Sequence, residues 1–281
     1  MSEPQSKTFF ITGVSSGFGR ALSEAALAAG HRVVGTLRKE QELAAFHALE
    51  PGRSHGVLLD VTDTARIAPT VAKIEAEIGP IDILINNAGY GHEGVFEEST
   101  LDELRRQLDV NFFGAAAVIQ AVLPHMRKRR AGRIINITSM GGIVTFPGVS
   151  YYHASKFALE GLSESLGKEV KGLGIHVTAV EPGSFRTDWA GRSMIRAARS
   201  IPDYDAVMNP LRERRQAASG HQQGDPAKAA AAILTIVEAK DPPAHLLLGS
   251  DAVRFAQEKM QALQAEFDRW KSVSLSTDYP A

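Results

Sequence analysis

The sequence predicts an α/β fold: a doubly wound parallel sheet of seven strands with helices on both faces. Three observations predict it. Strand-length runs rich in apolar residues alternate with segments of helical spacing, the runs show no strict polar–apolar alternation, and a glycine-rich loop follows the first run. Continuous apolar runs such as 81–85 are typical of strands covered on both faces. Right-handed crossovers between parallel strands place helices on both faces, and the strand order expected for such a doubly wound sheet is 3-2-1-4-5-6-7.

The individual elements follow from this alternation. Strands are expected at residues 8–12, 32–37, 56–59, 82–86, 133–138, 175–180 and 244–248. Helices are expected at about 20–29, 41–49, 64–78, 101–126, 151–172 and 226–239, with a C-terminal helix over 251–271 and a loose end after it. No linker or shift in composition divides the chain, so residues 1–281 are expected to form a single domain.

Composition narrows the classes of function. The formal net charge is −1, so no general attraction to nucleic acid or membrane is expected. The chain has no cysteine, which excludes disulfides and thiol catalysis, and its scattered histidines predict no metal site. The first seven residues do not resemble a signal peptide, and no uninterrupted apolar run approaches the length of a membrane span. A soluble, cytoplasmic protein is expected.

A glycine-rich loop joins the first strand to the first helix. Gly13 permits a tight turn, Gly17 lets the backbone approach a pyrophosphate, and Gly19 lets the helix pack against the strand. The N–H groups at the start of the following helix favour phosphate binding. Strand, loop, helix and second strand therefore make the first unit of a Rossmann-like dinucleotide-binding fold, in which ligands bind at the carboxyl ends of the strands.

The same loop also matches the G-x-S-x-G nucleophile elbow of hydrolases, as Gly13-Val14-Ser15-Ser16-Gly17. An elbow needs a later acid and a later histidine, and His245, the late candidate, lies inside an apolar strand. Only one predicted strand precedes the loop, and Gly19 has no role in an elbow. Serine hydrolysis is therefore the least favoured alternative.

A tyrosine and a lysine lie four residues apart at the start of the predicted helix 151–172. Tyr152 and Lys156 therefore share one face of the helix. A nearby ammonium lowers the pKa of a tyrosine from its reference of about 10, and such a tyrosine exchanges protons with an alcohol or ketone oxygen. Tyr151 is expected to point elsewhere. Such pairs also occur by chance on many helices, so this interpretation depends on the surrounding motifs.

The end of the second predicted strand indicates which dinucleotide is bound. NAD-binding folds carry a carboxylate about 20 residues after the glycines. Here the strand is followed by Arg38 and Lys39 instead. The Arg38 guanidinium can bind a 2′-phosphate through two hydrogen bonds, and the hydroxyls of Ser15 and Ser16 can add others. NADP(H) is therefore expected in preference to NAD(H), the alternative being that the two cations only face solvent.

Together these motifs resemble the short-chain dehydrogenase/reductase family over about residues 8–190. Residues 12–19 are similar to the family's T-G-x-x-x-G-x-G loop, Asp60-Val61 to the pair that contacts adenine, and Asn86-Asn87-Ala88-Gly89 to a structural turn. Pro182-Gly183 followed by Thr187 resembles the segment beside the nicotinamide, although Thr187 can equally cap the next helix. The cofactor-binding set comprises Gly13, Ser15, Ser16, Gly17, Phe18, Gly19, Arg38, Asp60, Val61, Asn87, Ala88, Gly89, Tyr152, Lys156, Pro182, Gly183, Phe185 and Thr187.

The resemblance also implies a catalytic tetrad, formed by Asn111, Ser139, Tyr152 and Lys156. Ser139 would hydrogen-bond the substrate oxygen, and Tyr152 would act as general acid in reduction and general base in oxidation. Lys156 would lower the tyrosine pKa and hold the nicotinamide ribose, and Asn111 would hold a water that links Lys156 to solvent. The alternatives are a turn serine and a buried helix asparagine. A cofactor-binding sensor without turnover is the second class of function, and it has no need of all four residues.

Finer motifs bear on the substrate. Gly35-Thr36-Leu37-Arg38 and the run 154–161 most resemble the 17β-hydroxysteroid and retinol dehydrogenase branch, which implies a lipophilic alcohol or ketone. The segment 189–224 is expected to be a substrate lid of short helices with breaks at Pro202 and Pro210. A homodimer through the helices at 101 and 151 is expected by analogy.

Overall fold

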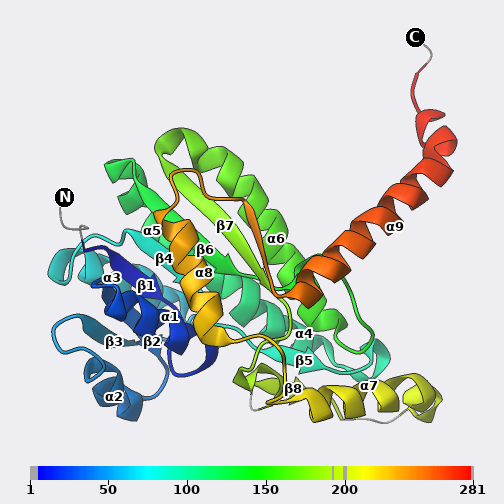
Figure 1. The fold of residues 1–281 in the computed structure, drawn as a ribbon, viewed down its shortest axis with the longest axis horizontal. Coiled ribbons are helices and arrows are strands. Elements are labelled where there is room, and N and C mark those ends of the chain that lie inside the picture. The colour runs from blue at the N-terminus through cyan, green and yellow to red at the C-terminus, as the bar shows by residue number, and fades with distance from the viewer. Residues whose placement is uncertain (1–5, 192, 199–200, 280–281) are drawn as a thin grey trace.

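Seven parallel strands form one sheet in the order β3-β2-β1-β4-β6-β7-β9 (Figure 1). The labels β5 and β8 belong to a second sheet, so the seven strands, counted along the chain, have the predicted order 3-2-1-4-5-6-7. The computed structural model describes residues 6–191, 193–198 and 201–279. The strands are β1 (Thr8–Ile11), β2 (Arg32–Leu37), β3 (Ser54–Leu58), β4 (Ile83–Asn86), β6 (Gly132–Ile137), β7 (Ile175–Pro182) and β9 (His245–Leu248).

Helices cover both faces of the sheet. On one face, α1 (Gly17–Ala28), α2 (Leu43–His47) and α8 (Pro226–Glu238) enclose one apolar core, and on the other α3 (Thr64–Glu77), α5 (Ala115–Arg129) and α6 (Ser150–Val170) enclose a second. In β1, Phe9 and Ile11 belong to the first core and Phe10 to the second, all fully buried. Alternate side chains of β1 thus enter opposite cores, which is why this strand has consecutive apolar residues and no polar–apolar alternation.

The predicted helix 101–126 contains a turn of wider pitch. It begins at α4 (Leu101–Leu108), where Thr100 and Glu103 form a reciprocal capping box, and passes through a π-helical segment at Asp109–Gly114 into α5. Such π turns are frequent at functional sites. This one contains Asn111, a predicted site residue.

The same stretch, Leu101–Arg129, is the one helix of the described residues that is long and apolar enough to cross a membrane. It passes by length and composition alone, with a mean hydropathy of 1.2 and 33% of the window buried. In this structure α5 packs against α3, β4 and β6. Core helices pass the same test, so this finding is weak evidence for a membrane span.

A second, two-stranded sheet lies beside the main one. β5 (Gly91–Glu93) pairs in parallel with β8 (Met194–Arg196), so the predicted lid segment 189–224 contains a strand. A 3-10 turn at Pro202–Tyr204 and α7 (Asp205–Ala218) follow. The break expected at Pro210 is wrong, because α7 continues through it. A proline in the second turn removes one backbone hydrogen bond, and the helix tolerates that loss.

The C-terminal helix projects from the body of the molecule. α9 (Ser250–Leu275) is longer than the expected 251–271, so residues expected in the loose end continue the helix. Only Ala252 and Ala256 are buried, and the helix extends away from the sheet (Figure 1). The exposed large apolar side chains on its outer part are Met260, Phe267, Trp270, Val273 and Leu275.

Candidate active site

Tyr152 and Lys156 lie on the inner face of α6, 7% and 6% exposed. Tyr151 points away, as predicted: its hydroxyl donates to the Ser99 carbonyl at 3.0 Å, and its ring stacks on His92. The helix therefore separates the two adjacent tyrosines. Only Tyr152 faces the carboxyl end of the sheet.

Ser139 follows β6 and meets Tyr152. Its hydroxyl accepts a hydrogen bond from the Gly141 N–H at 2.9 Å. Burial raises the pKa of Tyr152 to about 12, and the nearby Ser139 hydroxyl opposes that rise. The pKa lowering expected from a neighbouring ammonium is therefore not found in this structure. The phenol is a protonated hydrogen-bond donor at neutral pH.

Lys156 explains why the expected lowering is missing. Its ammonium donates to the Ile137 carbonyl at 2.8 Å and lies 5.7 Å from the centre of the Tyr152 ring. The spacing of four residues thus brings the ammonium over the ring face and not to the phenol oxygen. Burial lowers the pKa of Lys156 to about 8, while the carboxylate of Glu160 opposes the shift.

Asn111 is buried, and its amide is held by backbone and side-chain groups. Its Oδ1 accepts from the Tyr90 N–H at 3.0 Å, and its Nδ2 donates to the Tyr90 carbonyl at 3.0 Å and to Ser155 Oγ at 3.1 Å. A Cβ added at Gly89 would lie 3.1 Å from Asn111 Oδ1 and 3.8 Å from Lys156 Nζ. Because residue 89 is an exposed glycine, no side chain enters the space between Asn111 and Lys156. A water is expected in this space from the sequence.

The glycine loop has the shape expected of a phosphate cradle. Gly13 and Gly17 have positive φ angles of 72° and 56°, which favour glycine. A Cβ at Gly19 would overlap the Gly13 carbonyl. The Asn87 amide donates to the carbonyls of Thr12 at 2.9 Å and Gly13 at 2.8 Å and fixes the turn. The loop is thus locked in shape by its neighbour across the sheet.

The other predicted cofactor residues surround this loop. Ser15 is exposed, and Ser16 precedes α1 as its N-cap. Arg38 is exposed just after β2, and in the part of the chain that the structure describes it has no hydrogen bond or ion pair. Asp60 Oδ1 accepts from the backbone and hydroxyl of Thr62 at 2.9 and 2.8 Å.

Val61 and Ala88 serve mainly to pack the site. Val61 is buried in the second core, and Ala88 packs against the same core. A Cβ at Gly13 would lie 3.1 Å from the Ala88 Cα, so the two loops are in close contact. Val61 follows the carboxyl end of β3, and Ala88 follows that of β4.

The segment after β7 closes the other side. Pro182 ends β7, and the Gly183 N–H donates to the Leu248 carbonyl at 2.8 Å. The Phe185 ring lies 5.1 Å from that of Phe18, so α1 and this segment meet at the glycine loop. Thr187 caps the short 3-10 turn Asp188–Ala190, which is the alternative that the sequence left open.

Sequence reasoning missed two aromatic side chains at the centre of the site. The Trp189 ring lies 5.0 Å from the Tyr152 ring and covers it. His153 Nδ1 lies 2.7 Å from the Gly141 carbonyl, and its Nε2 accepts from the Phe146 N–H at 2.8 Å, which fixes the loop after Ser139. From the sequence, Trp189 was expected only as part of a lid. For His153, its place directly after Tyr152 in the sequence was the signal that could have indicated a position near the site.

The fold contradicts the serine hydrolase alternative. Ser15 follows the carboxyl end of β1, whereas His245 begins β9 at the amino end of its strand, four strands away in the sheet. His245 Nδ1 instead lies 2.6 Å from Glu181 Oε1. Ser15 therefore has no histidine from this late strand to activate it.

Comparisons with known proteins agree with this geometry. The family model for short chain dehydrogenase matches residues 7–196. "Oxidoreductase BOA17" of Botryotinia fuckeliana is 38% identical over 272 residues, covering 96% of this chain and 99% of the relative. "3-ketodihydrosphingosine reductase" of Bacteroides thetaiotaomicron is 39% identical over 260 residues, covering 91% of this chain and 93% of the relative. A crystal structure of a short-chain dehydrogenase from Streptomyces avermitilis is 44% identical, with a TM-score of 0.92 over 99% of this chain and 100% of that one.

The chain therefore belongs to the short-chain dehydrogenase family, and it is an oxidoreductase. A nicotinamide dinucleotide is the cofactor of this class. The 17β-hydroxysteroid and retinol dehydrogenase branch stays a prediction.

Proposed function

We propose that this protein reduces a ketone or aldehyde to an alcohol with NADPH, and that Tyr152 supplies the proton. The observation that carries the proposal is the buried phenol of Tyr152 beside the Ser139 hydroxyl at the carboxyl end of the sheet, with Lys156 one helical turn away. The dinucleotide supplies a hydride to the carbonyl carbon. Catalytic silence is disfavoured because a sensor needs neither the buried phenol nor the buried ammonium.

The glycine loop supports dinucleotide binding. Side chains at Gly13 and Gly19 would collide with Ala88 and with the Gly13 carbonyl, so glycine lets this turn close tightly in front of α1. The N–H groups at the start of α1 are suited to bind a phosphate there. The guanidinium of Arg38, which has no partner among the described residues, supports a 2′-phosphate and hence NADP(H) over NAD(H). Ser15, Ser16 and Asp60 are the further polar groups of the proposed binding surface.

Tyr152 is suited to the direction of reduction. A phenol whose pKa is raised to about 12 is fully protonated at neutral pH and donates to the carbonyl oxygen as negative charge develops there. Ser139 Oγ, already fixed by the Gly141 N–H, orients that oxygen and stabilises its charge. The positive charge of Lys156 then stabilises the phenolate that remains. Oxidation of an alcohol requires that phenolate first, so it is expected to be favoured by alkaline pH.

Trp189 supports a closed, dry site. Its ring covers Tyr152, so a substrate must displace or slide beneath it to reach the phenol. The name of the Bacteroides relative indicates a long-chain keto substrate for that protein. With the apolar lid side chains Met194 and Met208 buried on this side of the molecule, a lipophilic carbonyl compound is the substrate class we propose.

The first prediction tests the role of Tyr152. In an NADPH-oxidation assay over steroid, retinoid, aliphatic and aromatic carbonyls, Tyr152→Phe is expected to lose turnover by about 10² or more. Binding of NADPH, measured by fluorescence titration, is expected to stay within a few-fold, because the ring and its packing remain. Tyr151→Phe is the matched control, since it removes only the bond to Ser99 and should keep its turnover. Equal turnover in Tyr152→Phe and the natural protein would refute the mechanism.

A further inference from the structure

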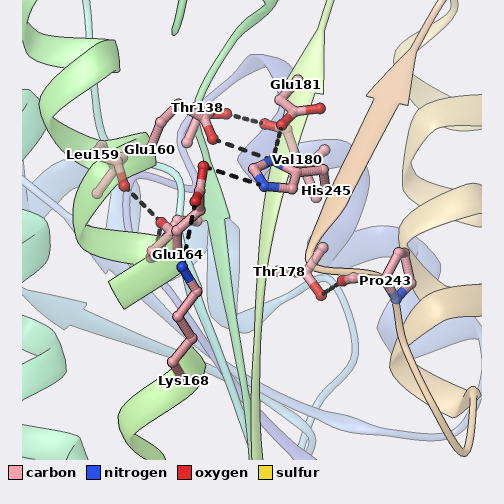
Figure 2. A network of polar contacts seen from close by, with 12 residues as sticks. Thr138, Leu159, Glu160, Glu164, Lys168, Thr178, Val180, Glu181, Pro243 and His245 are labelled. Atoms are coloured by element: carbon pink, nitrogen blue, oxygen red, sulfur yellow. Dashed lines mark hydrogen bonds and ion pairs between the residues drawn. The ribbon is translucent and has the colours of Figure 1, made fainter. Parts of the chain in front are cut away.

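Three ionisable side chains from distant parts of the chain meet between α6, β7 and β9. They are Glu160, Glu181 and His245 (Figure 2). One ligand atom from each lies within 4.8 Å of the others. His245 Nδ1 is 2.6 Å from Glu181 Oε1 and 3.6 Å from Glu160 Oε2. The expectation of no metal site rests on spacing along the sequence, which does not reveal this cluster.

The carboxyl groups of Glu160 and Glu181 are buried, and most of their oxygens have no hydrogen-bond partner among the described residues. Glu160 is 6% and Glu181 0% exposed. Both oxygens of Glu160 and Oε2 of Glu181 lack a hydrogen-bond partner among the described residues. The Thr138 hydroxyl is adjacent, but its single hydrogen is donated to the Val180 carbonyl at 2.8 Å. Two neighbouring buried carboxylates require a positive partner or a shared proton.

His245 is the ionisable side chain that contacts both carboxyl groups, and it is 42% exposed and so only partly withdrawn from water. The ammonium of Lys156, one turn before Glu160 on α6, donates instead to the Ile137 carbonyl. The two buried carboxylates are therefore better compensated by a divalent ion than by this imidazole alone.

The other side of the imidazole has the environment of a metal ligand. His245 Nε2 lies 3.5 Å from Glu164 Oε1, while Nδ1 faces the two buried carboxylates (Figure 2). Histidines that bind a metal commonly donate their second ring nitrogen to a carboxylate, which fixes the ring and its tautomer. Glu164 lies one turn after Glu160 on α6 and is placed for that role.

We propose that Glu160, Glu181 and His245 bind a divalent transition metal of the zinc class, with a fourth position open to water beside His245. One imidazole nitrogen and two carboxylate oxygens form a donor set that zinc accepts. At zinc–ligand distances of about 2.0–2.1 Å, donor atoms of a tetrahedral site lie about 3.3 Å apart. The 2.6 Å contact must widen slightly and the 3.6 Å contact must shorten slightly.

The site would tie three elements together. Glu160 belongs to α6, Glu181 to the end of β7, and His245 to the start of β9, the edge strand that leads into α9. It is distinct from the site built on Ser139 and Tyr152, and its role is to stabilise the fold at this edge.

The test uses the full, tag-free chain freed of metal with EDTA. Titration calorimetry with Zn²⁺ is expected to give one bound ion per chain, whereas Mg²⁺, which prefers all-oxygen ligands, gives none. A hundred-fold excess of Zn²⁺ over its dissociation constant is expected to raise the melting temperature by about 5 °C. His245→Ala, at a partly exposed position, should abolish both effects, and Glu181→Gln should weaken them. His221→Ala, which removes an exposed histidine elsewhere, should leave both unchanged.

Two outcomes would overturn the proposal. One is that the natural protein binds no zinc, or that His245→Ala and the length-preserving His245→Gln bind zinc as tightly as the natural protein does. The other is a protonated carboxyl band in the infrared spectrum that persists in excess Zn²⁺ and disappears in Glu160→Gln. That second result would show that the pair shares a proton and binds no metal.

Discussion

At the scale of single residues, Arg38 is the side chain that we propose selects between the two dinucleotides. It is exposed at the carboxyl end of β2, and its charge is unused within the described chain. In Arg38→Asp, the carboxylate repels a 2′-phosphate and accepts hydrogen bonds from a ribose hydroxyl. We expect the ratio of kcat/KM for NADPH to that for NADH to fall by about 10- to 100-fold.

The neighbouring Lys39 provides the control, because Lys39→Asp makes the same change in charge one residue away. Steady-state assays with both cofactors should show a smaller change in that ratio for Lys39→Asp. Equal changes in the two variants would mean that general electrostatic attraction, and not a specific contact of Arg38, selects the cofactor.

Lys156 makes the stability of the protein depend on pH. Burial lowers its pKa to about 8 from 10.5, so the folded state binds this proton less tightly than the unfolded state. The free energy of unfolding is therefore expected to rise as pH increases from about 8 toward 10, by at most about 1.4 kcal/mol per pH unit. Urea denaturation at several pH values measures it.

Variants of α6 isolate this contribution. Lys156→Met should flatten the rise, whereas Lys168→Met, at an exposed lysine of the same helix, should preserve it. The measurements stop below pH 10, because the raised pKa of Tyr152 reverses the trend above that value. A rise that persists unchanged in Lys156→Met would assign the pH dependence to another group.

At the scale of elements, ion pairs hold the lid segment on the body. Glu93 in β5 is 2% exposed and binds Arg196 in β8 at 2.9 Å and Arg215 in α7 at 2.6 Å. Glu93→Gln leaves both guanidinium groups without this charge, at a cost of about 1–3 kcal/mol, since Arg196 is half-exposed. Hydrogen exchange over residues 194–198 and 205–218 is expected to accelerate about 5- to 100-fold.

The control for this prediction is Glu97→Gln. Glu97 also contacts the lid, through the Tyr204 hydroxyl at 2.7 Å, but it is exposed, so its loss should change exchange little. Exchange in the lid that is unaffected by Glu93→Gln would show that apolar packing, and not the buried charges, holds the segment closed.

At the scale of the whole molecule, the strand order and the position of the site are predictable from the sequence. The alternation of runs orders the sheet, and strand ends such as the one before Ser139 show where side chains gather. The sheet of β5 and β8 is not predictable, because strands of three residues are too short to show a period.

The electrostatics of the site also depend on contacts that sequence spacing does not show. The pKa of Tyr152 is set by burial, to which the tertiary contact with Trp189 contributes. The cluster of Glu160, Glu181 and His245 joins residues up to 85 positions apart, counting from 160 to 245. The π-helical turn around Asn111 interrupts a helix whose apolar spacing predicts continuity.

The amide of Asn87 has one more consequence. Its two hydrogen bonds to the Thr12 and Gly13 carbonyls hold the turn that we propose binds phosphate, and they do so before any nucleotide arrives. A preorganised turn loses little conformational freedom on association, so the ordering entropy has already been lost during folding. Much of the affinity for the dinucleotide would thus be controlled from a neighbouring strand, by a side chain whose amide hydrogens are already engaged by the protein itself.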